Sequence, residues 1–129
     1  MKKRIVVTGG SGRFGSCLKD IITKHKIFFP KKNTFNILNP DSMRKYLRKT
    51  NADVVIHLAG LSRPMSIHER NINKSIELNI IGTANIVKIC EKYNIKLIYF
   101  STGYVYEGKK GNYKETDPVK PFNNYGLSK

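Results

Sequence analysis

Short apolar runs alternate along the chain with segments in which hydrophobic residues recur at helical spacing. The runs predict buried strands, because they are rich in β-branched residues and are bounded by glycine or polar turns. The segments between them predict helices that each present one apolar face. The predicted strands are residues 4–8, 27–29, 53–58 and 96–101, and the predicted helices are residues 13–25, a helix beginning at 40, 71–92 and 122–129.

Strands that alternate with helices indicate a parallel sheet with right-handed crossovers. We therefore expect an α/β, Rossmann-type doubly wound sheet of four strands, in the order 3-2-1-4 when numbered along the chain. Asn39 and Pro40 are typical of a helix start, with asparagine as the cap. Met43 and Leu47, four residues apart, are expected in the core. The glycines and prolines of residues 103–121 predict a loop or hairpin.

The chain has 129 residues, of which 40% are hydrophobic and 26% charged, as is typical of one globular domain. Its apolar runs are too short for a transmembrane helix, and glycines interrupt the first run before it could form a signal peptide. Cys17 and Cys90 lie far apart, which excludes a disulfide scaffold and a cysteine zinc site. His25, His57 and His68 are dispersed, so no metal site is expected. These features predict a reduced, cytoplasmic protein.

Basic residues dominate the charge: 24 Lys and Arg stand against 9 Asp and Glu, giving a net charge of +15. One interpretation is a polyanionic partner, either nucleic acid or a phosphorylated small molecule. The other is compositional bias, which we favour because the basic residues are scattered rather than grouped in long runs. No helix-turn-helix, zinc or aromatic stacking pattern supports nucleic-acid binding. The charge would still attract a diphosphate ligand.

A glycine-rich loop follows the first predicted strand. Of its glycines, one would make the tight turn, one would let backbone N–H groups approach a pyrophosphate, and one would let helix and strand pack closely. The three are Gly9, Gly12 and Gly15. A glycine string alone is a weak signal, but its position between a strand and a helix favours dinucleotide binding over a structural turn. Arg13 and Phe14 belong to the same loop and to the expected cofactor site.

The segment after the second predicted strand bears on which dinucleotide would bind. A site for NAD usually carries an acidic residue about 20 residues beyond the glycines. Residues 27–38 contain no acidic residue, but they contain Lys31 and Lys32. Because basic groups such as these and Arg13 suit a ribose 2′-phosphate, we expect NADP(H) as cofactor, with NAD(H) as the alternative. A solvated lysine pair is the competing structural interpretation.

The ends of the later strands carry further candidate residues, since open α/β sheets bind ligands there. Ala59 and Gly60 are small enough for the cofactor ribose and nicotinamide to pass close to them. His57, just before them, is expected to be a packed strand residue. Tyr125 and Lys129 are four residues apart and would share a helix face. An ammonium beside the phenol would lower the pKa of Tyr125 and make it a usable general acid or base.

In order and spacing these motifs resemble the extended short-chain dehydrogenase/reductase superfamily, which includes NAD-dependent epimerases and dehydratases. The resemblance covers residues 4–129 and rests on the patterns TGxxGxxG, HLAG, STxxVY and PxxxYGxSK. The last two patterns look most like the dTDP-4-dehydrorhamnose reductases, which use NADPH to reduce the 4-keto group of a nucleotide-linked deoxysugar. The resemblance therefore implies a nucleotide-sugar substrate.

The resemblance also implies roles for individual residues. Thr102, Tyr125 and Lys129 would form the catalytic triad. Thr102 would orient the carbonyl, Tyr125 would protonate the nascent alkoxide, and Lys129 would hold the nicotinamide ribose and tune Tyr125. Asn79 matches a helix position that supports the active site in the family. Gly103 stands where the reductases usually carry Asp. The family's dehydratases carry an Asp-Glu pair at this point, and because Gly103 and Tyr104 offer no carboxylate, a dehydratase is disfavoured and an epimerase stays an alternative.

Members of this superfamily are about twice as long or longer. Residues 1–129 are therefore interpreted as a single, incomplete NAD(P)-binding domain without the C-terminal substrate domain. The fourth strand would be an uncovered edge, which invites a second copy or a partner chain, and the last helix would be marginal without tertiary support. We expect weak or no catalysis by this chain alone, and a non-catalytic NADP-binding regulatory module is the alternative function.

Overall fold

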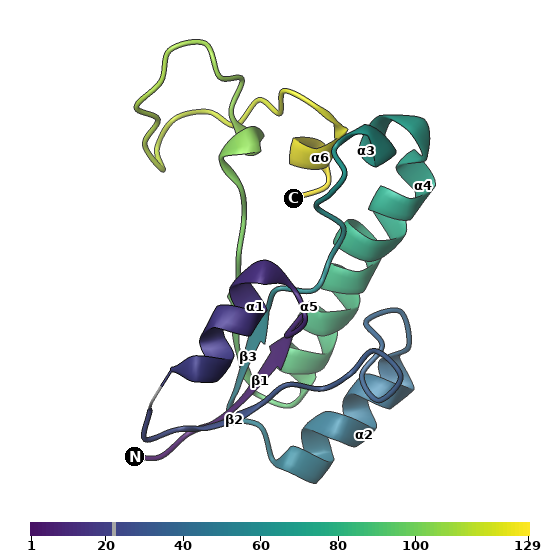
Figure 1. Cartoon of the computed structure of the whole chain (residues 1–129), viewed down its shortest axis with the longest axis vertical. Helices are drawn as coiled ribbons and strands as arrows, with labels where there is room; N and C mark the ends of the chain where they lie inside the picture. Colours follow the sequence, from purple (N-terminus) through teal and green to yellow (C-terminus); the bar gives the residue numbers. More distant parts are fainter. Residues whose placement is uncertain (22) are drawn as a thin grey trace.

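A computed structural model describes residues 1–21 and 23–129 (Figure 1), and four parallel strands form one sheet within it. The strands are β1 (Arg4–Thr8), β2 (Lys26–Phe28), β3 (Val54–His57) and β4 (Lys96–Tyr99). The helices are α1 (Arg13–Cys17), α2 (Pro40–Thr50), α3 (Ser66–Arg70), α4 (Ile72–Ser75), α5 (Gly82–Lys92) and α6 (Asn124–Leu127). The predicted α/β, Rossmann-type class is confirmed. None of the described helices combines the length and apolar character that crossing a membrane requires.

The strand order is β2-β1-β3-β4, so the predicted order 3-2-1-4 is wrong. The strand β3 pairs with β1, with Thr8 opposite His57, instead of lying outside β2. The reason is burial: Val6 and Val7 of β1 have no exposed surface, so both edges of β1 must be paired. The strand β2 has three residues, none of them fully buried. The winding therefore reverses at β1, and the ends of β1 and β3 lie side by side.

The first helix is shorter than its apolar periodicity predicts. It ends at Cys17 and is followed by a single 3-10 turn. Phe14 and Ile21, which were expected on its apolar face, are 49% and 54% exposed. Ile22, expected on the same face, lies outside the described residues. With so little apolar surface buried, this segment gains too little from packing to extend the α-helix.

The second helix begins as predicted. The side-chain oxygen of Asn39 accepts a hydrogen bond of 3.0 Å from the backbone N–H of Ser42, which caps α2. Met43 and Leu47 are buried, as expected. They belong to a core between the sheet and the helices α2 and α5, which contains Val6, Phe35, Ile37, Met43, Leu47, Val55, Ile86, Ile89 and Cys90.

The predicted helix 71–92 consists of three consecutive segments: α4, a π-helical segment (Ile76–Ile81) and α5. Three residues in its C-terminal half are buried as expected, namely Ile86, Ile89 and Cys90. Three in its N-terminal half are exposed instead, namely Ile72, Ile76 and Ile80. The wider π turn contains Ile76 and Ile80 and follows Ile72, and it accounts for this difference because it shifts these positions away from the stripe that faces the core.

Residues 103–121 form a loop, not a hairpin, and contain one 3-10 turn (Gly103–Val105). Figure 1 shows this loop projecting away from the sheet before the chain returns to α6 beside α3 and α4. The helix α6 is present as predicted but ends at Leu127. The end of the chain therefore lies against the N-terminal part of the long helical run.

Candidate dinucleotide site

The loop between β1 and α1 is built around close backbone contacts. Gly9 has a φ of +71°, and a Cβ atom there would lie 2.7 Å from the backbone nitrogen of Ala59. A Cβ on Gly15 would collide with the carbonyl oxygen of Gly9. The N–H of Gly12 donates to that same oxygen at 3.0 Å. The loop thus has the tight turn and the close helix contact that a phosphate-binding loop requires.

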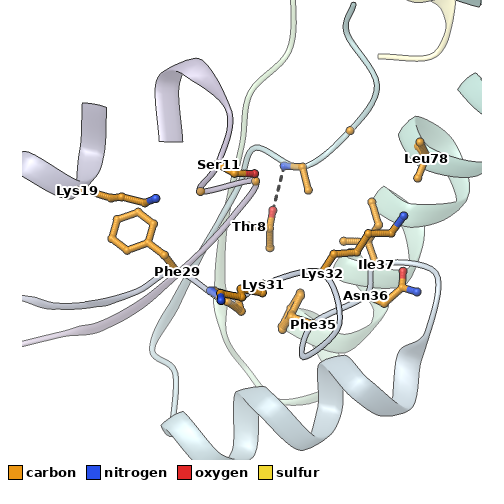
Figure 2. Close-up of a pocket in the computed structure, with 15 residues that line it drawn as sticks. Thr8, Ser11, Lys19, Phe29, Lys31, Lys32, Phe35, Asn36, Ile37 and Leu78 are labelled. Carbon is orange, nitrogen blue, oxygen red and sulfur yellow. Dashed lines mark hydrogen bonds between the residues drawn. The ribbon is translucent and has the colours of Figure 1, made fainter. Parts of the chain in front are cut away.

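A side-chain bridge joins the ends of β1 and β3. The hydroxyl of Thr8 lies 2.8 Å from Nδ1 of His57 and accepts a hydrogen bond of 3.1 Å from the N–H of Ala59. Figure 2 shows the second of these bonds beside the glycine loop. Thr8 and His57 are both buried. The bridge fixes the position of Ala59 relative to the glycine loop.

His57 is a packed residue, as expected. Its Nε2 lies 3.2 Å from the hydroxyl of Thr83, and its ring stacks on that of Tyr99 with centroids 5.7 Å apart. Burial, and secondly the charge of Lys129, lower the pKa of His57 to about 4. The imidazole is therefore neutral near pH 7 and makes a fixed hydrogen-bonded link rather than a proton-transfer group.

A pocket of about 480 Å³ opens beside this bridge (Figure 2). It is lined by the glycine loop, by the segment after β2 and by the residues that follow β3. Five of the expected cofactor residues meet there, namely Gly9, Lys31, Lys32, Ala59 and Gly60. Seven others do not line it, namely Gly12, Arg13, Phe14, Gly15, Asn79, Tyr125 and Lys129. No acidic side chain lines it among the described residues.

Lys19 also lines the pocket and was not among the residues expected at the site. Its ammonium lies 5.8 Å from the centroid of the Phe29 ring, and Figure 2 shows the two side chains together on one wall. Lys19 stands four residues after Gly15, one helical turn along, so this spacing could have identified it. Together with Lys31 and Lys32 it gives the pocket three cationic side chains.

Asn79 holds the segment that follows Gly60. Its side chain accepts a hydrogen bond of 2.7 Å from the N–H of Leu61 and donates one of 2.8 Å to the carbonyl of the same residue. A Cβ on Gly60 would lie 2.8 Å from the side-chain oxygen of Asn79. The π-helical segment that carries Asn79 is of a kind frequent at functional sites. Asn79 therefore holds the backbone beside Gly60, which lines the pocket, although Asn79 itself does not line it.

A buried polar cluster that the sequence did not reveal lies beneath α6. Nδ1 of His68 lies 2.6 Å from the hydroxyl of Ser75, which donates to Ser128 at 3.3 Å. The amide of Asn79 donates to the same Ser128 oxygen at 2.9 Å. The rings of His68 and Tyr125 are 4.9 Å apart. His68 lies on α3 and Ser75 on α4, with the non-helical Asn71 between the two helices, so helical spacing in the sequence could not have indicated this cluster.

Contacts at its N-terminal end and at Gly126 hold the single turn of α6 in place. Both side-chain oxygens of Glu69 accept hydrogen bonds from Asn124, at 3.1 Å from its backbone N–H and at 2.6 Å from its amide. Asn123 caps the helix by accepting a hydrogen bond of 2.8 Å from the N–H of Gly126. Gly126 packs so closely on Tyr104 that a Cβ would collide with its carbonyl oxygen. These contacts fix the backbone around Tyr125.

The three candidate catalytic residues have separate surroundings. The hydroxyl of Thr102 accepts a hydrogen bond of 3.3 Å from the N–H of Tyr104. The Tyr125 ring packs against Tyr104, with centroids 5.8 Å apart. Lys129 lies beyond the end of α6, and its ammonium is 4.4 Å from the centroid of Tyr99. Tyr125 and Lys129 therefore do not share a helix face in this structure.

Known proteins resemble this chain along nearly its whole length. It is 31% identical to methionine adenosyltransferase 2 subunit beta of Danio rerio, over 98% of this chain and 41% of that protein. It is 25% identical to dTDP-4-dehydrorhamnose reductase of Aggregatibacter actinomycetemcomitans, over 98% of this chain and 44% of that one. The solved dTDP-4-dehydrorhamnose reductase of Bacillus anthracis str. Ames, in complex with NADP, matches with a TM-score of 0.90 and 26% identity, covering 99% of this chain and 46% of that one. The chain thus spans less than half the length of these relatives.

One protein family matches nearly the whole chain, and not only its separate motifs. The family described as the RmlD substrate binding domain matches residues 2–129. This range contains the glycine loop, the ends of β1 and β3, the π-helical segment and α6. The chain therefore belongs to the RmlD substrate binding domain family and has the fold of the dTDP-4-dehydrorhamnose reductases.

Proposed function

We propose that this chain binds NADP(H) and supplies the cofactor-binding part of a reductase for 4-keto-6-deoxy nucleotide-sugars such as dTDP-4-dehydrorhamnose. The observation that carries the proposal is the pocket in which a glycine loop meets Lys19, Lys31 and Lys32 without an acidic residue. A carboxylate that hydrogen-bonds a ribose 2′-hydroxyl is the usual mark of an NAD site. Three ammonium groups in its place favour a ribose that carries a 2′-phosphate.

The residues of the pocket fit the parts of the dinucleotide. Gly9, Gly10 and Ser11 of the glycine loop line the pocket, so the pyrophosphate would lie against the backbone of this loop. Phe29 offers an aromatic wall for the adenine, next to the lysines that would hold the 2′-phosphate. Ala59 would border the nicotinamide half. When bound, NADPH supplies the hydride for carbonyl reduction.

Proton transfer would fall to residues near α6. The Tyr125 phenol would donate its proton to the carbonyl oxygen of the sugar, and the hydroxyl of Thr102 would hydrogen-bond that oxygen. Lys129 would stabilise the phenolate that Tyr125 leaves behind, provided that its ammonium turns away from Tyr99. Because the present conformation places Lys129 against Tyr99, we expect weak turnover or none from this chain alone.

Thermal melts with NADPH and with NADH test the cofactor proposal. A ligand at 100 times its Kd stabilises the folded state by about 2.7 kcal/mol, which raises the Tm by several degrees at this size. We expect a larger shift with NADPH than with NADH, and loss of this preference in Lys31→Glu with Lys32→Glu. The double variant Lys45→Glu with Lys49→Glu, on α2, changes the net charge equally and should keep the preference. A cooperative melt that neither cofactor shifts would refute the proposal.

A non-catalytic role on the same fold is the second candidate. One relative is named as a subunit of methionine adenosyltransferase 2, and it shares 31% identity with this chain. The contact of Lys129 with Tyr99 rather than Tyr125 also favours this candidate. Turnover of dTDP-4-dehydrorhamnose that is lost in Tyr125→Phe would identify an enzyme. NADPH binding without such turnover would support a regulatory module.

The cysteines fit the cytoplasmic location that the sequence predicts. Cys17 is exposed and Cys90 is buried, and neither is in a disulfide. Burial raises the pKa of the Cys90 thiol to about 11, so this residue packs as an unreactive thiol. Free thiols of this kind persist in a reducing compartment.

A further inference from the structure

Lys19 brings a cation to the side of the dinucleotide pocket where the first helix ends. It lies in the 3-10 turn Leu18–Asp20, directly after α1, and its side chain lines the pocket. Arg13, the basic residue that the sequence motif places at the cofactor, lies at the start of α1 and does not line the pocket. The cation of this wall therefore comes from a later position in the chain than the motif suggests.

The Phe29 ring directs the Lys19 side chain. The ammonium of Lys19 lies 5.8 Å from the centroid of this ring, which is a cation–π contact. The ring itself is half-buried against the glycine loop, since a Cβ on Gly10 would lie 2.8 Å from Cδ1 of Phe29. In Figure 2 the side chains of Lys19 and Phe29 lie together, away from that of Lys32. A long side chain that would otherwise sample many rotamers is thus held along one wall of the pocket.

No carboxylate within the described ranges neutralises the cations of this pocket. The ion pairs found there involve other basic residues, namely Arg4, Arg44, Lys109, Lys110 and Lys120. The backbone of Lys31 is held in a tight turn, because its carbonyl accepts hydrogen bonds of 3.0 Å from the N–H groups of Thr34 and Phe35. Lys19 and Lys31 thus come from two separately fixed segments, and both are free to meet a ligand anion.

We infer that Lys19, held by Phe29, contacts the 2′-phosphate of NADP(H) and selects for it, given the NADP(H) binding proposed above. Gly10 belongs to the loop that would face the pyrophosphate. Phe29 touches Gly10, so its ring lies where the adenosine ribose would follow the pyrophosphate. A phosphate on that ribose would lie between Lys19 and Lys31 and accept charge-assisted hydrogen bonds from both ammonium groups.

A lysine that binds the pyrophosphate would behave differently. NADPH and NADH both carry the pyrophosphate, so such a lysine would strengthen the binding of both cofactors. A lysine at the 2′-phosphate strengthens the binding of NADPH alone, and a solvated lysine affects neither cofactor. The ratio of the two affinities therefore distinguishes the three roles of Lys19.

Calorimetric titration of the whole chain with NADPH and with NADH measures this ratio. Lys19→Met keeps an unbranched apolar side chain and removes the charge, so NADPH should bind at least about fivefold weaker while the affinity for NADH changes by less than about twofold. Lys19→Arg keeps the charge and should keep most of the preference for NADPH. The matched control Lys45→Met, on α2 and outside the pocket, removes the same charge and should leave both affinities within about twofold of the parent values. Circular dichroism melts check that each variant folds as the parent chain does.

Two further measurements test the contact itself. An ammonium beside the 2′-phosphate lowers the pKa of that phosphate, so its phosphorus NMR signal in bound NADP⁺ should titrate at higher pH in Lys19→Met than in the parent chain. The pyrophosphate signals should be the same in both proteins. The role of Phe29 is tested by a double-mutant cycle: in a Phe29→Leu background, where the ammonium is no longer held, Lys19→Met should weaken NADPH binding less than it does in the parent chain.

Three results would overturn this role of Lys19 while the parent chain still prefers NADPH, so that the proposed function stands. Equal weakening of NADPH and NADH by Lys19→Met would assign the ammonium to the pyrophosphate. An unchanged ratio of the two affinities would make Lys19 a solvated residue. Loss of the preference in Arg13→Met but not in Lys19→Met would return the 2′-phosphate to the residue that the motif suggests. A parent chain that binds NADPH no tighter than NADH would instead refute the proposed NADP(H) site, and the role of Lys19 with it.

Discussion

The Thr8 hydroxyl lies 2.8 Å from Nδ1 of His57, so one side-chain contact joins the ends of β1 and β3. The same hydroxyl accepts hydrogen bonds from the backbone N–H groups of Leu58, at 3.2 Å, and Ala59, at 3.1 Å. The Thr8 side chain thus ties β1 to the residues at the end of β3, at the point where the sheet reverses its winding. This contact is the structural reason why the glycine loop and Ala59 face one pocket.

Replacing Thr8 by valine keeps the shape of the side chain and removes its oxygen. His57 and two backbone N–H groups would then lose a buried partner, so we expect the free energy of unfolding to fall by about 1–3 kcal/mol. Urea denaturation followed by circular dichroism measures the change. The exposed Thr116→Val is the matched control and should stay within about 0.5 kcal/mol of the parent chain. An equal effect of the two substitutions would show that the contact contributes nothing.

Acid should weaken the fold through His57. Its pKa is about 4 in the folded chain, mainly because of burial, against 6.5 for an exposed imidazole. The unfolded chain therefore takes up a proton at a pH where the folded chain does not, so stability is lost as the pH falls from about 6.5 to about 4.

The variant His57→Gln tests the origin of this loss. The free energy of unfolding, measured by urea denaturation between pH 7 and pH 4.5, should depend less on pH in His57→Gln than in the parent chain. His25→Gln, at a half-buried histidine outside the core, is the control and should keep the parent slope. Identical slopes for all three proteins would assign the acid sensitivity to other groups.

Adding one methyl group at Gly15 should disturb the glycine loop. The new Cβ would collide with the carbonyl oxygen of Gly9, and backbone at this point has no room to move away. We expect Gly15→Ala to lose about 1–3 kcal/mol of stability and at least about tenfold in affinity for NADPH, measured by urea denaturation and calorimetric titration. Gly103→Ala, where a Cβ meets nothing within 4 Å, should change neither quantity. Unchanged NADPH affinity in a folded Gly15→Ala would argue against the loop as the phosphate site.

The polar cluster under α6 should control how firmly Tyr125 is held. His68→Leu removes the partner of Ser75 and with it the chain of hydrogen bonds that reaches Ser128. We expect faster amide exchange in α6 while the core helix α2 keeps its protection, as measured by hydrogen–deuterium exchange. Uniformly faster exchange in both helices would mean that His68 acts on global stability instead.

Local features of this fold could be predicted from the sequence, whereas long-range pairing could not. The cap at Asn39 and the burial of Met43 and Leu47 depend on neighbours within one or two helical turns, so their spacing was sufficient. The strand order depends on which buried strand needs two partners, and all the predicted strands are similarly short and apolar. Sequence spacing does not distinguish between them.

Part of the candidate site could be predicted from its position after the predicted strands. Gly9, Lys31, Lys32, Ala59 and Gly60 follow strand ends, and parallel strands bring their carboxyl ends to one edge of the sheet. Other positions depend on irregular backbone, which periodicity does not reveal. Lys129 lies beyond α6, which ends at Leu127, and Asn79 lies in the π-helical segment, where its side chain bonds Leu61.

Because of the π-helical segment, the buried side chains in the two halves of the long helical run point in different directions. Ser75 just before the segment and Asn79 within it face the polar cluster, and after it Ile86 and Ile89 face the apolar core. Each residue of an α-helix turns the chain by about 100°. Deleting a single residue between Asn79 and Ile86 would rotate the residues on one side of the deletion by about 100° relative to those on the other side. The helix could then present the right side chains to the polar cluster or to the apolar core, but not to both. Tolerance of length changes in this segment is therefore low, even though most of its side chains face solvent.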